Sequence, residues 1–384
     1  MISKMDQYKQ NEIEKALEEH DLKVLCNGYD DLPTIIQDVR RIIVIGDIHG
    51  DFKLAIACLK LVKLIDDNYD WIGGDTVVVQ VGDQIDRCRP LNGKCNEEGM
   101  TINDEHSDIK IMELFTLLHK QALAVGGAVY SLIGNHEILN SQGQMNYVSK
   151  EGLDGFSGYK DPDTGKVYQD GLHGRTLAFK PGKQYARFMG CTRNGAIIIG
   201  SNLFVHAGIL PEYARHLNIK EPRDLESINK LLRLWLLGKI SEDNVSDIIS
   251  SQKFSMFWTR IIGGIPPGVD STHPVCEKYL RNVLNILQVG HMIVGHTPQF
   301  YQNKKGINSS CQGAIWRVDY GGSEAFSPFD DMGQQEPMDT RRPQVLEILN
   351  DSEFRVITED GVIEESDDSN DIIMQEASPS PENR

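Results

Sequence analysis

Short apolar runs early in the chain each end in a cluster of polar residues. The runs cover residues 41–45, 76–81 and 128–133. The clusters that follow them are GDIHGD (46–51), GDQIDR (82–87) and GNHE (134–137). Near-continuous apolar strands of this kind, separated by helical patterns at 54–64 and about 108–124, are typical of a buried sheet in an α/β protein. Because such sheets assemble their sites at the carboxyl ends of strands, we expect the three clusters to converge.

The second half of the chain alternates between short strands and helices. Apolar and β-branched segments predict strands at residues 196–200, 203–206, 291–294, 314–320, 343–349 and 354–358. Helical spacing predicts two or three helices within residues 222–251 and one helix at 277–288. Residues 322–342, which contain acidic groups and prolines, are expected to form a surface loop.

These patterns divide the chain into three parts. Residues 1–39 are expected to form a connector and a helix that packs on the body, because Ile13, Ala16 and Leu17 have helical spacing. Residues 40–358 form one domain with a helical insertion at 222–251, which either covers the mouth of the site or packs on a sheet. Residues 359–384 contain nine acidic residues, one basic residue and no aromatics, so we expect a disordered acidic tail.

Composition narrows the class of protein further. The apolar stretch at residues 231–237 is interrupted by Arg233 and is too short to cross a bilayer. The N-terminal segment lacks the apolar core of a secretory signal, so the seven cysteines are interpreted as reduced thiols in an intracellular, cytoplasmic protein. A net charge of −17 disfavours long-range attraction of nucleic acid. We therefore expect neither a membrane nor a nucleic-acid partner, and the oligomeric state stays open.

Side chains suited to metal binding lie just beyond several of the predicted strands. They are two carboxylates, one amide and three imidazoles: Asp47, Asp83, Asn135, His49, His206 and His296. A mixed nitrogen and oxygen set suits Mn, Fe or Zn, whereas Ca²⁺ prefers oxygen alone. The absence of cysteine from the set argues against a structural zinc cluster. Six ligands exceed one tetrahedral site and fit two ions that share a carboxylate.

The order of these motifs resembles a known family. The blocks GDIHG (46–50), GDQIDR (82–87), GNHE (134–137), HAG (206–208) and GHTP (295–298) are similar to those of the phosphoprotein phosphatase branch of the calcineurin-like metallophosphoesterases. Further matches, namely Asn140, WTR at 258–260, Cys276, Trp316 and Asp319, resemble the Shewanella-like, bacterial-type subgroup. The resemblance covers about residues 40–358. It implies an α/β fold, a four-layer α-β-β-α sandwich of two mixed sheets with metals at one sheet edge.

The resemblance also implies a role for each ligand in a centre of two divalent ions, with manganese favoured. Asp47 and His49 would hold the first ion, and Asp83 would bridge both. The remaining ligands, Asn135, His206 and His296, would complete the second. A hydroxide that bridges the two metals would attack the phosphorus of a phosphate monoester, since paired ions stabilise both the attacking and the leaving oxygen.

Five further residues are expected to have roles at the site, most of them implied by the resemblance. His136, oriented by Asp86, would protonate the leaving oxygen, and we expect it to point away from Asn135 along an extended backbone. Arg87 would clamp the phosphate oxygens, and Arg260 is the candidate for a second clamp. Glu137 is expected to support the metal ligands without binding a metal itself. The alternatives are a surface ion pair for Asp86 and Arg87, a structural role for His136, and a carboxylate partner for Arg260.

One residue departs from the family pattern, and a long polar segment follows it. Cys88 stands where a glycine normally follows the arginine, and a packed thiol is favoured over an acidified, redox-sensitive one. The polar segment 89–106 lies beside the expected phosphate site and is a candidate determinant of substrate choice.

The leading hypothesis is a protein serine/threonine phosphatase. Only the family resemblance favours a phosphoprotein substrate, because the ligand set predicts metal-dependent phosphoester hydrolysis in general. The alternatives are a nucleotide or small-molecule phosphoesterase, a phosphotyrosine preference, and a catalytically dead phospho-binding module. The last alternative is disfavoured because no ligand is missing.

Overall fold

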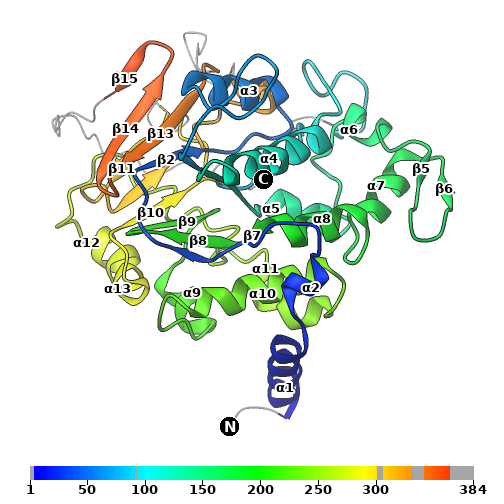
Figure 1. Ribbon diagram of the computed structural model, residues 1–384, viewed down its shortest axis with the longest axis horizontal. Coiled ribbons are helices and arrows are strands. Elements are labelled where there is room, and N and C mark those ends of the chain that lie inside the picture. The colour runs from blue at the N-terminus through cyan, green and yellow to red at the C-terminus, as the bar shows by residue number, and fades with distance from the viewer. Residues whose placement is uncertain (1–3, 91–92, 301–305, 331–340, 364–384) are drawn as a thin grey trace.

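The structure, a computed structural model, describes residues 4–90, 93–300, 306–330 and 341–363 (Figure 1). Its helices are α1 (Lys4–Glu19), α2 (Leu22–Leu25), α3 (Phe52–Leu61), α4 (Asp108–Leu123), α5 (Asn135–Ser141), α6 (Lys150–Asp154), α7 (Gly171–Phe179), α8 (Gln184–Thr192), α9 (Pro211–His216), α10 (Asp224–Leu236), α11 (Ser246–Ile249), α12 (Pro274–Cys276) and α13 (Asn282–Leu287). Short 3-10 and π turns are η1 (Glu242–Val245), η2 (Glu277–Arg281) and η3 (Glu324–Phe329). The strands are β1 (Ile35–Ile36), β2 (Arg41–Ile45), β3 (Val77–Gln80), β4 (Ala128–Leu132), β5 (Tyr159–Lys160), β6 (Val167–Tyr168), β7 (Arg193–Asn194), β8 (Ala196–Ile199), β9 (Asn202–Val205), β10 (His291–Val294), β11 (Asn308–Ser310), β12 (Ile315–Arg317), β13 (Gln344–Leu349), β14 (Glu353–Thr358) and β15 (Gly361–Ile363).

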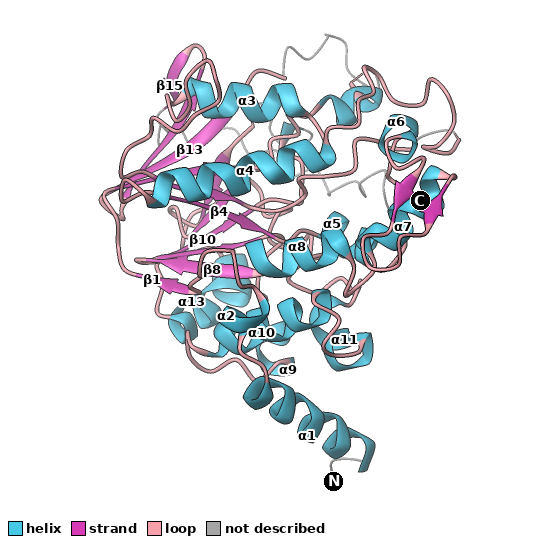
Figure 2. Ribbon diagram, turned by 45° about the vertical axis from the view of Figure 1, so that its right-hand side comes forward, coloured by secondary structure: helices cyan, strands magenta, loops and turns pink. Residues whose placement is uncertain are grey.

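Two mixed sheets form the centre of the molecule, as the sequence predicts. One sheet has the order β15-β14-β13-β2-β3-β4-β7, and the other has the order β1-β8-β9-β10-β12-β11. Side chains from both sheets, among them Val44, Phe204 and Ile293, lie in one buried apolar cluster. In Figure 2, α3 and α4 lie on the outer side of the first sheet, and α9, α10 and α13 lie beyond the second. The layers are therefore helix, sheet, sheet and helix.

The topology places the polar clusters at one sheet edge. Strands β2, β3 and β4 pair in parallel, with Ile43 opposite Val78 and Val78 opposite Val129. Strands β9, β10 and β12 of the second sheet are also parallel neighbours. Because the carboxyl ends of parallel strands meet at the same edge, the loops after β2, β3, β4, β9 and β10 converge.

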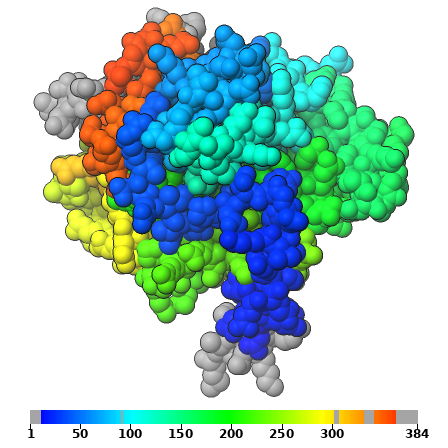
Figure 3. All heavy atoms as spheres, viewed as in Figure 1, coloured from blue at the N-terminus to red at the C-terminus, as the bar shows by residue number. Residues whose placement is uncertain are grey.

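The N-terminal helix packs on the body, as expected. Ala16 is buried, Ile13 and Leu17 contact the core, and the Lys230 ammonium donates to the Leu17 carbonyl. Figure 3 shows the N-terminal segment, in dark blue, lying across the surface of the body above the projecting α1. The segment 222–251 packs on β7 and β8 through α10, where the Asn229 amide oxygen accepts from the backbone N–H groups at the start of β8.

Two sequence-based boundaries need correction. Residues 361–363 pair with β14 as β15, so the first part of the expected acidic tail belongs to the sheet, and residues 364–384 lie outside the described residues. The expected surface loop at 322–342 contains η3, whose Phe326 and Phe329 are buried. Because these two rings are buried, this part of the segment packs against the body although its composition is polar. Residues 331–340 are not among those described.

The interpretation of the cysteines as reduced thiols is wrong for six of the seven. Disulfides join Cys26 to Cys191, Cys88 to Cys95, and Cys276 to Cys311, with Cα–Cα separations of 5.3, 5.7 and 5.8 Å. Cys88 is thus neither an acidified nor a packed thiol. Cys58 remains a buried thiol, and burial raises its pKa to about 12. Spacing along the chain gives no sign of pairs such as the first, which are 165 residues apart.

Within the described ranges, no helix combines the length and apolar character needed to cross a bilayer. The intracellular location stays a prediction. The reduced cysteines no longer support it, because disulfides are rare in the cytosol.

Candidate metal centre

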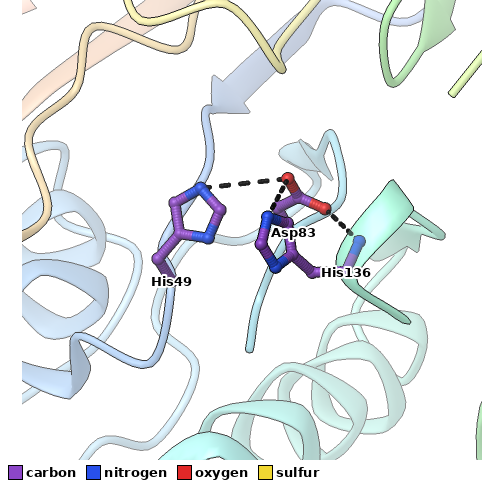
Figure 4. A group of neighbouring side chains, drawn as sticks. All are labelled: His49, Asp83 and His136. Atoms are coloured by element: carbon purple, nitrogen blue, oxygen red, sulfur yellow. Dashed lines mark hydrogen bonds and ion pairs between the residues drawn. The ribbon is translucent and has the colours of Figure 1, made fainter. Parts of the chain in front are cut away.

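The six expected ligands meet in one buried cluster. None of them is more than 5% exposed, although they come from five separate loops. Among the residues that the structure describes, two groups have ligand atoms close enough to hold an ion: His49, Asp83 and His136, and Asp83, His206 and His296. Figure 4 shows the first group, with both imidazoles turned toward the Asp83 carboxylate. The loops predicted to converge therefore do so.

One carboxylate oxygen lies between the two groups. Asp83 Oδ2 is 3.8 Å from His49 Nε2, 3.9 Å from His136 Nε2 and 3.3 Å from His206 Nε2. The other oxygen, Oδ1, accepts the backbone N–H of His136 at 3.0 Å. An oxygen surrounded by imidazoles from both groups has the position that a shared ligand of two ions requires.

The second group contains the expected amide. Asn135 Oδ1 lies 2.8 Å from His206 Nε2 and 2.9 Å from His296 Nδ1. His206 Nδ1 lies 2.9 Å from the Val81 carbonyl, which orients Nε2 toward the cluster. A ring nitrogen fixed in this way on a carbonyl is the usual arrangement of a metal-binding histidine.

Two ligand atoms in the cluster lack a hydrogen-bond partner in the described part of the chain, so a metal ion could be their partner. Asp47 Oδ2 accepts the His296 backbone N–H at 2.9 Å, and it lies 3.9 Å from His49 Nε2. Asp47 Oδ1 and His296 Nε2 are buried without a hydrogen-bond partner among the described residues. Leaving such atoms unpaired is costly, and two divalent ions, one at each group, would satisfy them. The donor set thus fits divalent cations.

The carboxyl groups of the cluster concentrate negative charge. Burial, together with Asp319 and Asp83, raises the pKa of the Asp47 carboxyl well above its usual value. Burial alone would also raise the pKa of Asp83, but the surrounding imidazoles hold that pKa well below the usual range. Burial raises the pKa of Asp319 to about 7. A bound cation would relieve this repulsion.

Two of the imidazoles are held neutral. Burial and the neighbouring Arg89 guanidinium lower the pKa of His49, and burial and Arg260 lower the pKa of His296. Neutral imidazole is the form that binds a metal. His206 differs, because its contact with Asp83 outweighs burial and raises its pKa.

The backbone at the site is held in unusual conformations. His49, Asp83, Asp86 and His296 have positive φ values of 45°, 51°, 71° and 67°. Such conformations cost free energy in residues other than glycine and cluster at functional sites. The buried Glu137 carboxylate helps to hold the loop by accepting the backbone N–H groups of Asp83, Gln84 and Gly134. This is the supporting role expected for Glu137.

His136 lies beside the cluster in a hydrogen-bonded network. The expectation of an extended backbone here is wrong, because Asn135 and His136 begin helix α5. His136 Nδ1 lies 2.8 Å from Asp86 Oδ2, and the Asn140 amide donates to both Asp86 oxygens at 2.9 and 3.0 Å. Asp86 is fully buried, so the pair it forms is not on the surface.

A buried arginine, Arg175, also belongs to this hydrogen-bonded network. Arg175 Nη2 lies 3.3 Å from Asp86 Oδ1 and 2.7 Å from Asp108 Oδ2, and its Nε donates to the Asn140 amide oxygen at 2.8 Å. Sequence reasoning missed Arg175, because it lies within α7, outside every polar cluster that follows a strand.

Three guanidinium groups lie near the cluster. Arg87 donates to Glu324 at 2.8 Å and to the Gly50 carbonyl at 3.1 Å. Arg260 donates to the His296 carbonyl at 2.9 Å. Arg89, which the sequence analysis did not select, has Nη2 2.7 Å from His49 Nε2. Its place two residues after Arg87 in the same loop was the only signal for it.

Comparison with known proteins agrees with this geometry. The calcineurin-like phosphoesterase family matches residues 40–300. An uncharacterized protein of Acanthamoeba polyphaga mimivirus is 39% identical over 259 residues, which cover 64% of this chain and 98% of the viral protein. Shewanella-like protein phosphatase 2 of Arabidopsis thaliana is 29% identical over 367 residues, covering 87% of this chain and 82% of the plant protein.

A solved structure confirms the fold. The cold-active protein-tyrosine phosphatase of a psychrophilic Shewanella species has a TM-score of 0.57 with this chain at 21% identity, covering 85% of this chain and 80% of the other. The family match covers more than half of the 384 residues and includes all six clustered ligands. The resemblance seen in the five sequence blocks is thereby confirmed, and the chain belongs to the calcineurin-like phosphoesterase family.

Proposed function

We propose that this protein is a phosphatase that uses two divalent metal ions to hydrolyse phosphate monoesters on other proteins. The observation that carries the proposal is the position of Asp83 Oδ2, which lies 3.3–3.9 Å from imidazole nitrogens of both groups. One carboxylate between two sets of ligands is the arrangement needed to hold two ions close together.

The chain would hold the ions with six side chains. Asp47 and His49 would bind the first, Asn135, His206 and His296 would bind the second, and Asp83 would serve both. When bound, the ions would make an attacking water more acidic and would stabilise negative charge on the phosphoryl oxygens. The mixed nitrogen and oxygen set suits Mn, Fe or Zn, and the family resemblance favours manganese among them.

His136 would supply the proton for the leaving group. Asp86 accepts the Nδ1–H bond of the ring, so Nε2 faces the cluster, where it lies 3.9 Å from Asp83 Oδ2. The carboxylate stabilises the protonated imidazole, and Nε2 would then donate its proton to the departing alkoxide. Asn140 and Arg175 keep the carboxylate in place during this transfer.

The substrate class rests on the relatives. The plant relative is named as a protein phosphatase and matches most of this chain, which supports a phosphoprotein substrate. The sequence resemblance favours phosphoserine and phosphothreonine. The Shewanella protein of similar fold is named as a tyrosine phosphatase, so phosphotyrosine is the second candidate.

A turnover panel tests the proposal. Purified protein loaded with Mn²⁺ is assayed on matched phosphoserine, phosphothreonine and phosphotyrosine peptides and on nucleotides. The proposal expects peptide turnover to exceed nucleotide turnover, with phosphoserine and phosphothreonine preferred. Turnover of nucleotides alone would replace it with a small-molecule phosphoesterase. Metal-loaded protein that turns over none of these substrates would contradict it.

A further inference from the structure

A further buried carboxylate, Asp319, lies at the sheet edge that carries the expected metal ligands. Strand β12 ends two residues before it and pairs in parallel with β10, where Val294 lies opposite Arg317. The Val318 N–H continues this pairing, because it donates to the Val294 carbonyl at 2.8 Å. Counted along the two strands, Asp319 therefore corresponds in position to the expected ligand His296.

The backbone of Asp319 also packs against the loop that carries Asp47. A Cβ atom on Gly46 would stand 2.1 Å from the Val318 carbonyl oxygen and 3.1 Å from the Asp319 Cα. Only a glycine permits so close an approach, and this glycine directly precedes Asp47. Asp47 Oδ2 in turn accepts the backbone N–H of His296 at 2.9 Å. Asp319 is thus next to the segments of two expected ligands.

One side-chain oxygen of Asp319 is fixed, and the other has no donor. Oδ1 accepts the Gly321 N–H at 2.9 Å, and the main-chain carbonyl accepts the Gln299 N–H at 2.9 Å. The residue is only 1% exposed, and Oδ2 is buried without a hydrogen-bond partner in the described part of the chain. Because a buried carboxylate oxygen without a partner is costly, Oδ2 needs a cation, or a group that a cation holds, to compensate it.

The charge of Asp319 acts directly on a metal ligand. After burial, Asp319 raises the pKa of the Asp47 carboxyl more than Asp83 or Glu137 does. Glu137 differs from Asp319, because its oxygens accept three backbone N–H groups. In protein without bound metal, the charge of Asp319 repels that of Asp47, whereas both attract a divalent cation.

The six expected ligands leave most of the metal charge unbalanced. Asp47 and Asp83 supply two negative charges, while the amide and the three imidazoles supply none. Two divalent ions carry four positive charges between them. A third carboxylate close to Asp47 reduces this imbalance in a buried site, where charge interactions are strong.

We propose that Asp319 is a further charged residue of the metal centre, which strengthens the binding of the ion at Asp47 and His49 without replacing any of the six ligands. The inference rests on the proposed function, because it requires metal ions at the cluster. It gives a physical role to a residue that the sequence distinguishes only by its match to the Shewanella-like subgroup.

The inference makes opposite predictions for metal-free and metal-loaded protein. Asp319→Asn removes one negative charge and keeps an oxygen that can accept from Gly321. In metal-free protein, the loss of repulsion with Asp47 should raise Tm. In loaded protein, the Kd of Mn²⁺ should rise about 10- to 100-fold, the usual effect of removing a group that supports metal ligands. A side chain that merely holds its loop would instead lower Tm in both states.

The experiment uses Mn²⁺ as the probe and the full-length protein. Calorimetry measures the Kd of Mn²⁺ for the wild type and for Asp319→Asn after removal of metal by chelation. Thermal unfolding gives Tm for the same proteins without metal and with saturating Mn²⁺, and the increase in Tm caused by Mn²⁺ should be smaller in the variant. Both measurements use a pH well above the Asp319 pKa of about 7, so that the carboxylate is ionised.

Asp161→Asn is the matched control. Asp161 is also 1% exposed, but it lies in the loop between β5 and β6, where it accepts from Thr164 and Lys183. Because its charge is already paired, its replacement should lower Tm in both states and leave the Kd of Mn²⁺ unchanged.

The outcomes separate this inference from the proposed function. Wild-type affinity for Mn²⁺ in Asp319→Asn would overturn the inference. A lower Tm of metal-free Asp319→Asn, or its failure to fold, would also overturn it, because either result would indicate a structural role. Failure of the wild-type protein to bind Mn²⁺ would instead refute the proposed function itself.

Discussion

Replacement of His136 by alanine tests the proton-transfer step. His136 Nδ1 lies 2.8 Å from Asp86, and its ring centre is 4.9 Å from those of His49 and Tyr147. Loss of a general acid typically slows a reaction by about 10²–10⁴-fold, or roughly 3–5 kcal/mol in the barrier. We expect a loss of this size in kcat for a phosphoserine peptide, whose alkoxide needs a proton to leave. For p-nitrophenyl phosphate, whose phenolate leaves unprotonated, we expect less than about tenfold.

The structure also predicts that this variant folds. Without His136, Asp86 Oδ1 keeps Asn140 and Arg175 as donors, and Oδ2 keeps Asn140. The buried carboxylate is therefore not left uncompensated. The expected loss in the free energy of unfolding is about 1–3 kcal/mol, typical of one hydrogen bond to a charged group. Leaving the Asp86 carboxylate without any donor would instead lower the free energy of unfolding by about 3–5 kcal/mol.

The assay compares kcat for the two substrates at saturating concentration, with urea unfolding as the stability measurement. His119→Ala is the matched control, because His119 is also buried and accepts a backbone hydrogen bond far from the cluster. It should lose stability while both kcat values stay near wild type. If His136→Ala slowed both substrates by the same factor, His136 would not be the acid.

Three further outcomes follow from the structure. Arg175→Leu removes the cation shared by Asp86 and Asp108, so the free energy of unfolding in urea should fall by about 3–5 kcal/mol; a loss below about 1 kcal/mol would contradict this. The Cys26–Cys191 disulfide spans 165 residues, and loop-closure entropy allows it up to about 5 kcal/mol; Cys26→Ser in non-reducing buffer should lower Tm, and an unchanged Tm would argue against the bond. Chelation should abolish turnover and Mn²⁺ should restore it; turnover that survives chelation with no metal left would contradict the metal requirement.

The sequence was most informative where one strand leads directly into one polar cluster. The run at 41–45 and the GDIHGD segment predicted both β2 and the position of Asp47 and His49, because strand period and strand end are local properties. The same holds for Asp83 after β3. Convergence of the loops could be predicted because parallel strands place their carboxyl ends together.

The parts that were missed depend on contacts between distant residues. Arg175 is 89 residues from Asp86, and nothing in the local pattern of α7 connects the two. Cys26 and Cys191 have no informative spacing. The start of α5 at Asn135 was also missed, because a Glu137 side chain that caps its own helix is a three-dimensional feature. The contact between Arg89 and His49 was also missed, because the place of Arg89 two residues after Arg87 gives no sign of it.

The central claim is that Asp83 is shared by two metal ions, and metal stoichiometry tests it most directly. The wild-type protein and Asp83→Asn are dialysed against Mn²⁺, and bound metal per chain is measured by mass spectrometry, with circular dichroism as the check on folding. We predict two ions per wild-type chain. A neutral amide cannot balance two dications, so we predict no more than one ion in Asp83→Asn, together with loss of turnover. Two ions retained by a folded Asp83→Asn protein, or none bound by the wild type, would contradict the account.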